Sequence, residues 1–213
     1  MAILHRAEIH PSKLELLAGW LPGKRWFRGP AEPRLTRLAA FRFDDPAGEV
    51  GVETLLVSAG DELVYQVPLT YRDAPLPGRD ASLVGTCEHS VLGKRWVYDA
   101  CGDPVYVAAL AAAVLRGDGQ AEEHIEVDGR LERREPSMSI ASTVADARPV
   151  PAIGQVDGVL DSDEVTSIIS TPLILTVVRG LELTVPPPST LPALTGAWPG
   201  QPRPIVLALA LTR

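Results

Sequence analysis

Alternation of apolar and polar side chains predicts β-strands in the first half of the chain. In the clearest segment, four apolar side chains fall on one face of a strand: Leu63, Tyr65, Val67 and Leu69. Segments 35–43 and 50–58 show a weaker form of this pattern, and short turns rich in Asp, Pro and Gly separate the three. Three consecutive strands joined by short turns predict an antiparallel meander.

Two segments have apolar side chains at helical spacing. Residues 11–19 predict a short helix, and residues 103–115 predict the strongest helix of the chain. In the second segment Asp103 is in the position of an N-cap, Pro104 follows at the first helical position, and Gly117 stands where a C-terminal cap belongs.

Short strands separated by turns continue in the second half. The predicted strands are residues 125–127, 131–133, 165–169, 173–178 and 205–211. Asp128–Gly129 predicts a hairpin turn, and Pro186–Pro188 predicts a stiff connection. Residues 137–151 are typical of a mobile linker or of a short strand with loops, and residues 198–204 of a loop.

The order of these elements predicts an α+β fold. A sheet flanked by helices is expected in residues 1–120, and a second, mostly-β part in residues 121–213. With 213 residues and 46% hydrophobic side chains, the chain is long enough to bury a substantial core. No apolar run approaches the length of a membrane-spanning helix.

Charge narrows the classes of partner. The formal net charge is −7 and the pI is about 5.1, whereas nucleic acids and anionic membranes attract basic surfaces. We therefore expect no nucleic acid and no membrane as partner. The first residues lack the apolar core of a signal peptide, which favours a cytoplasmic protein.

Searches for catalytic motifs find none. The glycine-rich loops that bind phosphates or dinucleotides are missing, as is Gly-x-Ser-x-Gly. Cys87 and Cys101 are not paired with further cysteines at a zinc-binding spacing, although His89 is near the first of them. We expect two free, buried thiols, no metal site, no cofactor and no catalytic residue.

An aromatic and basic cluster follows the first predicted helix. It contains Trp20, Lys24, Arg25 and Trp26. In one interpretation the aromatic rings pack the helix onto the sheet while the cations are solvated, and we favour this one because large aromatic side chains are usually buried. In the other, the four residues form a docking surface, since aromatic residues and Arg are enriched at binding hot spots.

A polar cluster is expected in the segment that holds both cysteines. Its members are Glu88, His89, Arg95 and Asp99. We favour an ion-pair network that fixes a hairpin. The alternative is a pocket for a small anion or a sugar.

Three separated motifs resemble one known family. Residues 17–29, which read LAGWLPGKRWFRG, resemble the opening of the N-terminal cap of bacterial maltokinases. Residues 64–69 (VYQVPL) and 97–104 (VYDACGDP) resemble the central strand of this cap and the segment that leads into its helix. The sequence of residues 85–99 resembles short stand-alone proteins with a cap-like sequence more closely than it resembles the kinases. The resemblance implies a curved antiparallel sheet flanked by helices.

In the family, the cap is joined to a kinase-like body that phosphorylates maltose with ATP. Residues 167–182 resemble the first strands of this body, but Thr176 stands where the resemblance implies the ATP-contacting Lys. A hydroxyl cannot supply the point charge of that Lys. No catalytic Asp loop or magnesium-binding Asp motif follows. The second half therefore resembles a truncated kinase N-lobe. We favour a protein without enzymatic activity.

These observations lead to three hypotheses for function. The first is a non-catalytic cap-like protein that interacts with, or regulates, an enzyme of maltose, trehalose or α-glucan metabolism. The second is a binding protein for a sugar or sugar phosphate that uses Arg95 and the surface around Trp20 and Trp26. The third is a transferase of unrecognised mechanism. Homo-oligomerisation is left open.

Overall fold

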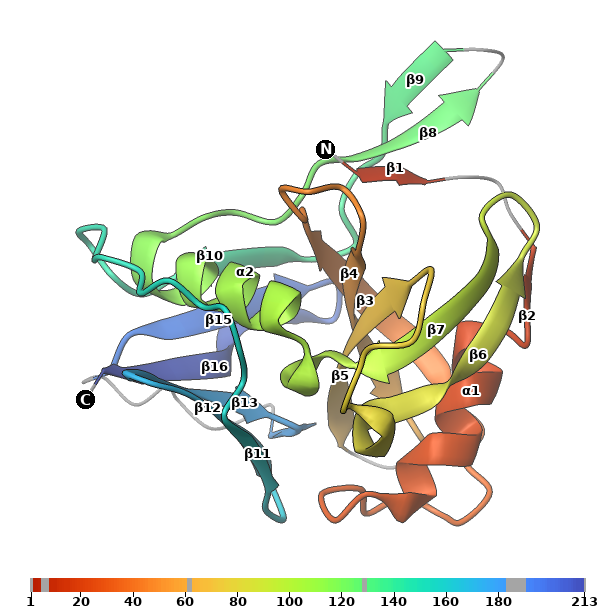
Figure 1. Ribbon diagram of the computed structural model, residues 1–213, viewed down its shortest axis with the longest axis horizontal. Coiled ribbons are helices and arrows are strands. Elements are labelled where there is room, and N and C mark those ends of the chain that lie inside the picture. Colours follow the sequence, from red (N-terminus) through yellow and green to blue (C-terminus); the bar gives the residue numbers. More distant parts are fainter. Residues whose placement is uncertain (1, 5–7, 61–62, 128–129, 183–190, 213) are drawn as a thin grey trace.

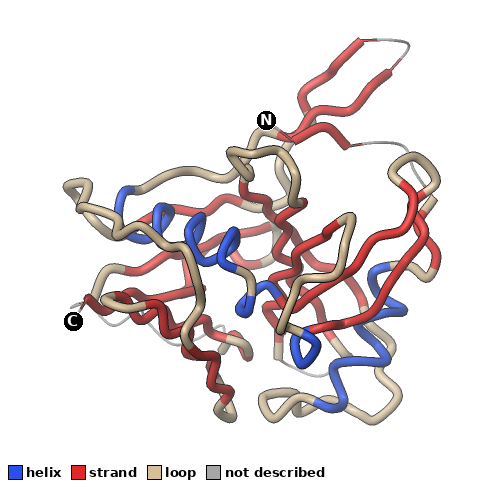
Figure 2. Tube along the Cα trace, in the orientation of Figure 1, coloured by secondary structure: helices blue, strands red, loops and turns tan. Residues whose placement is uncertain are grey.

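The computed structural model describes residues 2–4, 8–60, 63–127, 130–182 and 191–212 (Figures 1 and 2). Their strands form two antiparallel sheets and a smaller third sheet. The α-helices in these ranges are α1 (Lys13–Trp20) and α2 (Pro104–Arg116). The fold is therefore mostly β, which corrects the α+β prediction: the frequent Pro and Gly residues leave few stretches long enough for a helix.

The first sheet is curled into a half-barrel of seven strands (Figure 1). They are β2 (Ile9–His10), β3 (Thr36–Phe43), β4 (Gly51–Ser58), β5 (Val64–Arg72), β6 (Leu83–His89), β7 (Gly93–Asp99) and β14 (Gly180–Leu181). Their order is β2-β6-β7-β5-β4-β3, with β14 beside β5. All neighbours are antiparallel, so the predicted meander is confirmed as β3-β4-β5.

The second sheet has six antiparallel strands in the order β10-β15-β16-β13-β12-β11. They are β10 (Ser139–Ser142), β11 (Gly158–Asp161), β12 (Val165–Ser170), β13 (Leu173–Val178), β15 (Ala193–Trp198) and β16 (Gln201–Thr212). The loop predicted for residues 198–204 is wrong: Pro199 and Gly200 make a tight turn, and β16 begins directly after it.

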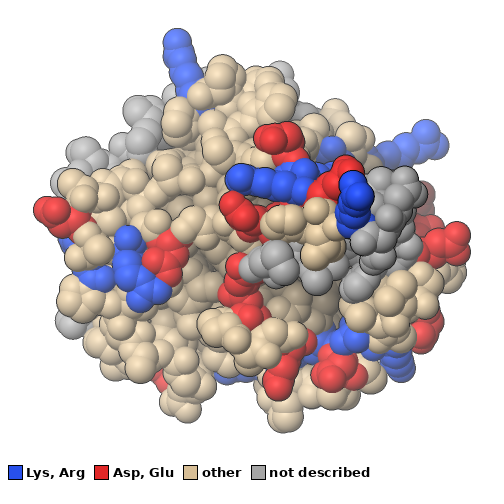
Figure 3. Space-filling model, turned by 90° about the horizontal axis from the view of Figure 1, so that it is seen from above, with Lys and Arg blue, Asp and Glu red and all other residues tan. Residues whose placement is uncertain are grey.

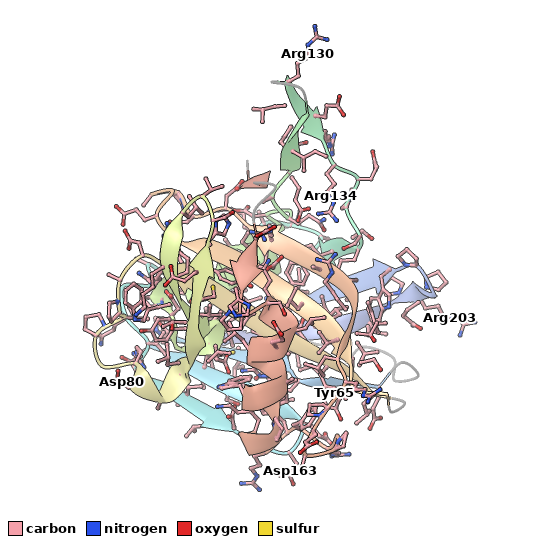
Figure 4. All side chains as sticks on the ribbon, turned by 90° about the vertical axis from the view of Figure 1, so that its right-hand side faces the viewer. Tyr65, Asp80, Arg130, Arg134, Asp163 and Arg203 are labelled. Carbon is pink, nitrogen blue, oxygen red and sulfur yellow. The ribbon has the colours of Figure 1, made fainter. Side chains whose placement is uncertain are left out.

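The third sheet consists of β1 (Ala2–Leu4), β8 (Glu123–Val127) and β9 (Arg130–Arg133). The β8–β9 hairpin projects from the body of the molecule, and Arg130 lies near its end (Figure 4). The predicted strands on either side of Asp128–Gly129 are thus confirmed, while that turn itself and Pro186–Pro188 lie outside the described residues.

Side-chain caps set the helix ends. Ser12 caps α1: its Oγ accepts a hydrogen bond from the Glu15 N–H at 3.3 Å, and the Glu15 carboxylate accepts one from the Ser12 N–H at 2.7 Å. The helix therefore begins at Lys13 rather than Pro11. Asp103 and Gly117 cap α2 as predicted, the glycine at φ 81°. Short 3₁₀ helices are η1 (Leu21–Gly23), η2 (Asp80–Ser82) and η3 (Ala100–Gly102).

The half-barrel sheet has a core on each of its faces. One face packs on α1, η1 and the segment that follows them; the other packs on α2 and the six-stranded sheet. Strand β4 is consequently buried on both sides, with Leu55 in one core and Leu56 in the other. Helix α1 approaches β6 closely at Gly85, where a Cβ atom would lie 2.8 Å from Leu16 Cδ2.

The core behind α2 contains side chains from both sides of residue 120. Phe41 and Phe43 of β3 belong to it together with Leu175 of β13 and Leu207 of β16. Strand β14 likewise joins the later part of the chain to β5 of the half-barrel. Within the described ranges, α2 is the longest helix, and none has the length and apolar character needed to cross a bilayer.

Candidate functional site

The structure removes Trp26 from the predicted docking surface. This side chain is 1% exposed and lies in the core between α1 and the half-barrel sheet. Its ring centroid is 5.9 Å from that of Trp20 and 6.5 Å from that of Tyr65. A side chain enclosed in this way offers no area to a partner, because the sheet and the helix already cover its ring.

The other three members of the cluster reach the surface. Lys24 Nζ lies 4.1 Å from the centroid of the half-buried Trp20 ring, a cation–π contact. Arg25 is exposed, and its Nε donates to Asp163 Oδ1 at 2.6 Å. Asp163 lies at the end of the molecule opposite the β8–β9 hairpin (Figure 4). Trp20, Lys24 and Arg25 therefore form a small amphipathic surface next to the β11–β12 turn.

Three members of the predicted polar cluster lie at the end of the β6–β7 hairpin. His89 Nδ1 accepts hydrogen bonds from the N–H groups of Val91 and Leu92, at 3.3 and 3.1 Å. Arg95 Nη2 donates to the Leu92 carbonyl oxygen at 2.6 Å. Glu88 is exposed opposite Lys94 in the ladder. These contacts order the turn through hydrogen bonds with the backbone, and the described structure has no ion pair between Glu88 and Arg95, unlike the predicted ion-pair network.

Asp99 does not belong to this cluster. It lies four residues beyond Arg95 on β7, a separation of about 13 Å along a strand. Its Oδ2 accepts a hydrogen bond at 2.6 Å from Arg179, which follows β13 in the second sheet. The prediction that placed Asp99 with Arg95 is therefore wrong, because a strand carries the two side chains to opposite ends of the hairpin.

Arg179 joins the two sheets in the interior. Its side chain is fully buried, its Nε donates to Thr166 Oγ1 at 2.7 Å, and its Cζ lies 4.7 Å from the centroid of the Trp26 ring. Nη1 has no hydrogen-bond partner in the described structure. Burial alone would lower the pKa of this guanidinium, but the charge of Asp99 outweighs it and raises that pKa. We call Arg179 and Asp99 the interior ion pair. Thr166 adds a neutral hydrogen bond to it.

A second charged group is centred on Glu53, in the middle of β4. This carboxylate is 3% exposed and accepts three hydrogen bonds. The donors are Lys13 Nζ at 2.5 Å, Arg42 Nη2 at 2.8 Å and the Tyr71 hydroxyl at 2.8 Å. Since Arg42, Glu53 and Tyr71 come from neighbouring strands, the half-barrel holds them in register, and the cap of α1 positions Lys13. We call these four residues the Glu53 cluster.

Ionisation in the Glu53 cluster is fixed by these contacts. Although burial by itself would raise it, the charges of Lys13 and Arg42 lower the pKa of Glu53 to about 2. Burial, reinforced by Glu53, raises the pKa of Tyr71 well above its ordinary value. The carboxylate therefore stays charged and the phenol stays protonated across the physiological range.

A pocket of about 440 Å³ lies beside this cluster, at the mouth of the half-barrel. Its lining comes from β2 and the start of α1, from the end of β3 through loop 44–50 to the start of β4, from β5 and from the β6–β7 hairpin. The charged, polar and larger apolar side chains of the lining include Ile9, Lys13, Arg42, Phe43, Asp44, Asp45, Glu49, Tyr71, Cys87, His89, Leu92 and Arg95. Seen from above, that side of the molecule carries basic and acidic side chains next to one another (Figure 3). The pocket thus brings His89 and Arg95 together with the Glu53 cluster.

The two cysteines lie in the interior. Both thiols are free and buried, as predicted. Burial raises the pKa of Cys87, which lines the pocket, and raises that of Cys101 still further. A protonated thiol is a poor nucleophile. In the part of the chain that the structure describes, no three or more His, Cys, Asp or Glu side chains are arranged to hold a metal ion.

The Glu53 cluster escaped sequence analysis. The one available signal was a single charged residue inside the otherwise uncharged segment 50–58, because an unpaired carboxylate is rarely buried. Its partners Lys13 and Arg42 are 40 and 11 residues away in the sequence. No local pattern connects them.

A comparison with known families supports the resemblance noted above. Residues 20–103 match the family described as the maltokinase N-terminal cap domain. The match spans fewer than half of the 213 residues and covers all of η1, β3, β4, β5, β6 and β7. No kinase-domain family is detected in the chain. No curated protein sequence matches it.

Proposed function

We propose that this protein is a non-catalytic binding protein that holds a small polar molecule, a sugar or a sugar phosphate, in the mouth pocket of its cap-like half-barrel. The observation that carries this proposal is the pocket itself. It gathers charged and polar side chains from five separate segments around a preformed cavity, and preformed cavities with a few convergent polar groups are typical of ligand sites.

The state of the ionisable groups supports a non-catalytic role. A general base needs a pKa near the working pH, whereas Glu53 is held ionised by two cations. Tyr71 and Cys87 are held protonated by burial. Thr176 lies within β13, on the strand where the kinase resemblance implies the ATP-contacting Lys. We expect purified protein with magnesium neither to hydrolyse ATP nor to phosphorylate maltose.

The likeness to the maltokinase cap supports a cytoplasmic role in maltose, trehalose or α-glucan metabolism. In this proposal the second sheet derives from a kinase N-lobe whose β12–β13 hairpin has kept its place beside the cap while the catalytic motifs are missing. The pocket would then sense or store a metabolite of the pathway.

Ligand-induced stabilisation tests the proposal. A ligand that binds only the folded protein raises its melting temperature in proportion to the logarithm of ligand concentration. Maltose, trehalose, glucose 1-phosphate and other small metabolites of these pathways are the probes. A probe that raises the melting temperature of the wild-type protein should not raise that of Arg95→Gln. It should still raise that of the matched variant Arg130→Gln, whose exposed side chain lies on the projecting hairpin.

A second candidate function is interaction with an enzyme of the same metabolism. It is favoured by the surface made by Trp20, Lys24 and Arg25, which combines half-buried aromatic area with two cations. Capture of a glucan-pathway enzyme that Arg25→Ala weakens would support this role. Capture that is unchanged in Arg25→Ala would count against this surface as the docking site.

A further inference from the structure

We infer that the ligand of the mouth pocket is neutral and rich in hydroxyl groups, a mono- or disaccharide rather than a phosphate ester. This inference rests on the function proposed above and narrows its ligand class. Three observations carry it: the pairing of the cations, the number of carboxylates around the cavity, and the mixture of polar and apolar groups in its lining.

Two of the three cations that line the pocket are already paired. Lys13 and Arg42 both donate to Glu53, and Arg42 Nε also lies 3.6 Å from a Glu123 carboxylate oxygen. A phosphate that drew either cation away would leave Glu53 buried without its counter-charge, which is strongly unfavourable. In the described lining, Arg95 is the cation that makes no ion pair, and a single guanidinium is a weak basis for holding a dianion.

Carboxylates outnumber the lining cations once Glu53 is included. Asp44, Asp45 and Glu49 lie on the loop that forms one side of the pocket, and Glu53 lies beside its lining residues Lys13, Arg42 and Tyr71. Among the described residues, three lining carboxylates and the adjacent Glu53 therefore stand against three ammonium or guanidinium groups. An incoming phosphate would meet a net negative potential, whereas a neutral molecule would not.

The polar groups that remain are suited to hydroxyls. Asp45 is used within its own loop, where it accepts hydrogen bonds from the N–H groups of Ala47, Glu49 and Val50. The Glu49 carboxylate is exposed, lines the same cavity as Arg95 and can accept hydrogen bonds from a ligand. Arg95 makes one hydrogen bond, through Nη2, and its buried Nε has none. A hydroxyl group donates and accepts, so it can use both side chains at once, while a phosphate oxygen only accepts.

The apolar part of the lining fits the same class. Ile9, Phe43 and Leu92 border the cavity between the charged groups. Sugar rings present C–H groups as well as hydroxyls, so an alternation of apolar and polar lining covers both. A cavity of about 440 Å³ is in the range of small-molecule sites, and its size suits one or two sugar rings.

Isothermal titration at low and high salt separates the ligand classes. The probes are glucose, maltose and trehalose on one side, and glucose 1-phosphate and inorganic phosphate on the other. We expect binding of a neutral saccharide with an affinity that salt leaves unchanged, because no net charge is screened. Glu49→Gln should weaken it about tenfold, the loss expected for one hydrogen bond to a charged group. The matched variant Glu132→Gln, on exposed β9, should bind as wild type does.

The other outcomes are equally informative. Binding of phosphate-bearing probes alone, weakened by salt and strengthened in Glu49→Gln, would overturn the neutral-ligand inference and leave the proposed binding function standing. A cooperative melting transition shows that the protein used in the titration is folded. If neither class of probe binds to such protein, the proposed function fails together with the inference. Neutral binding that survives both Arg95→Gln and Glu49→Gln would place the saccharide elsewhere and overturn the inference.

Discussion

The Glu53 cluster and the interior ion pair are both buried charges, but they are built in opposite ways. Glu53 is one carboxylate with three donors, two of them cations, at the edge of a cavity. Arg179 is one guanidinium with one carboxylate, deep between two sheets, and its Nη1 has no partner in the described structure. Glu53 is satisfied by three donors, whereas Arg179 donates to Asp99, Thr166 and Cys101 and has one nitrogen without a partner among the described residues.

In the proposed function, this difference separates the binding region from the structural joint. Beside the cavity, Lys13 and Arg42 are held by Glu53, and the hydrogen-bonding capacity that remains belongs to Arg95. In the interior, Arg179 depends on Asp99 for its ion pair, and water cannot replace a missing partner there. The two regions therefore differ in which groups remain able to contact a ligand.

The largest predicted effect is at the joint. Arg179→Ala leaves Asp99 buried without its cation and opens a cavity beside Trp26, so the free energy of unfolding should fall by about 3–5 kcal/mol. Urea denaturation measures it. The double variant Asp99→Ala with Arg179→Met removes both charges and should recover a large part of the loss. A single variant as stable as wild type would show that the pair contributes nothing to the joint.

Acid should act mainly through the Glu53 cluster. The pKa of Glu53 is depressed from 4.5 to about 2, so its contribution is present above pH 4.5 and is lost as pH falls from 4.5 toward 2. The loss over that window is about 3 kcal/mol. Denaturation at a series of pH values measures it. In Glu53→Gln the slope in this window should be smaller, and an unchanged slope would assign the acid sensitivity to other carboxylates.

A half-buried aromatic side chain should give a loss of stability between those of the buried charges and those of the exposed ion pair. Trp96 of β7 is half-buried, with Lys94 Nζ 4.9 Å from its ring centroid. Trp96→Ala should lower the free energy of unfolding by about 1–2 kcal/mol, less than a fully enclosed aromatic side chain costs. A loss equal to that of Arg179→Ala would mean that burial alone, and not charge pairing, explains the joint.

The smallest effect is expected on the exposed ion pair. Arg25 and Asp163 are 67% and 65% exposed, so solvent screens their attraction. Arg25→Ala should leave the melting temperature unchanged within error in differential scanning fluorimetry. A large drop would show that this pair stabilises the fold, and would exclude Arg25 as a residue devoted to docking.

Local patterns predicted the elements well. The Asp103-Pro104 start and the Gly117 end of α2 follow from backbone chemistry within a few residues, and the predicted strands 165–169 and 173–178 correspond to β12 and β13. The limits appear where contacts are distant. Residues 137–151 lack a clear alternation, so the sequence left open a linker or a short strand there, and pairing with β15 rather than its own pattern orders β10.

The candidate site was only partly predictable for the same reason. Arg95 and His89 stood out because they occur in one dense segment. Glu53 and Arg179 each sit as single charges in apolar stretches, and their partners come from other strands or from the other sheet. A sequence shows that such a charge must be satisfied but does not show by which residue.

The shared core has a consequence for how the chain unfolds. Residues 20–103 cut from the rest would leave Phe41 and Phe43 without the strands that cover them, and Asp99 without Arg179. Such a fragment should be prone to aggregation. In the intact chain the two sheets should lose their structure together, in one transition, and the slowest-exchanging amide protons of β5 and β13 should report the same opening free energy.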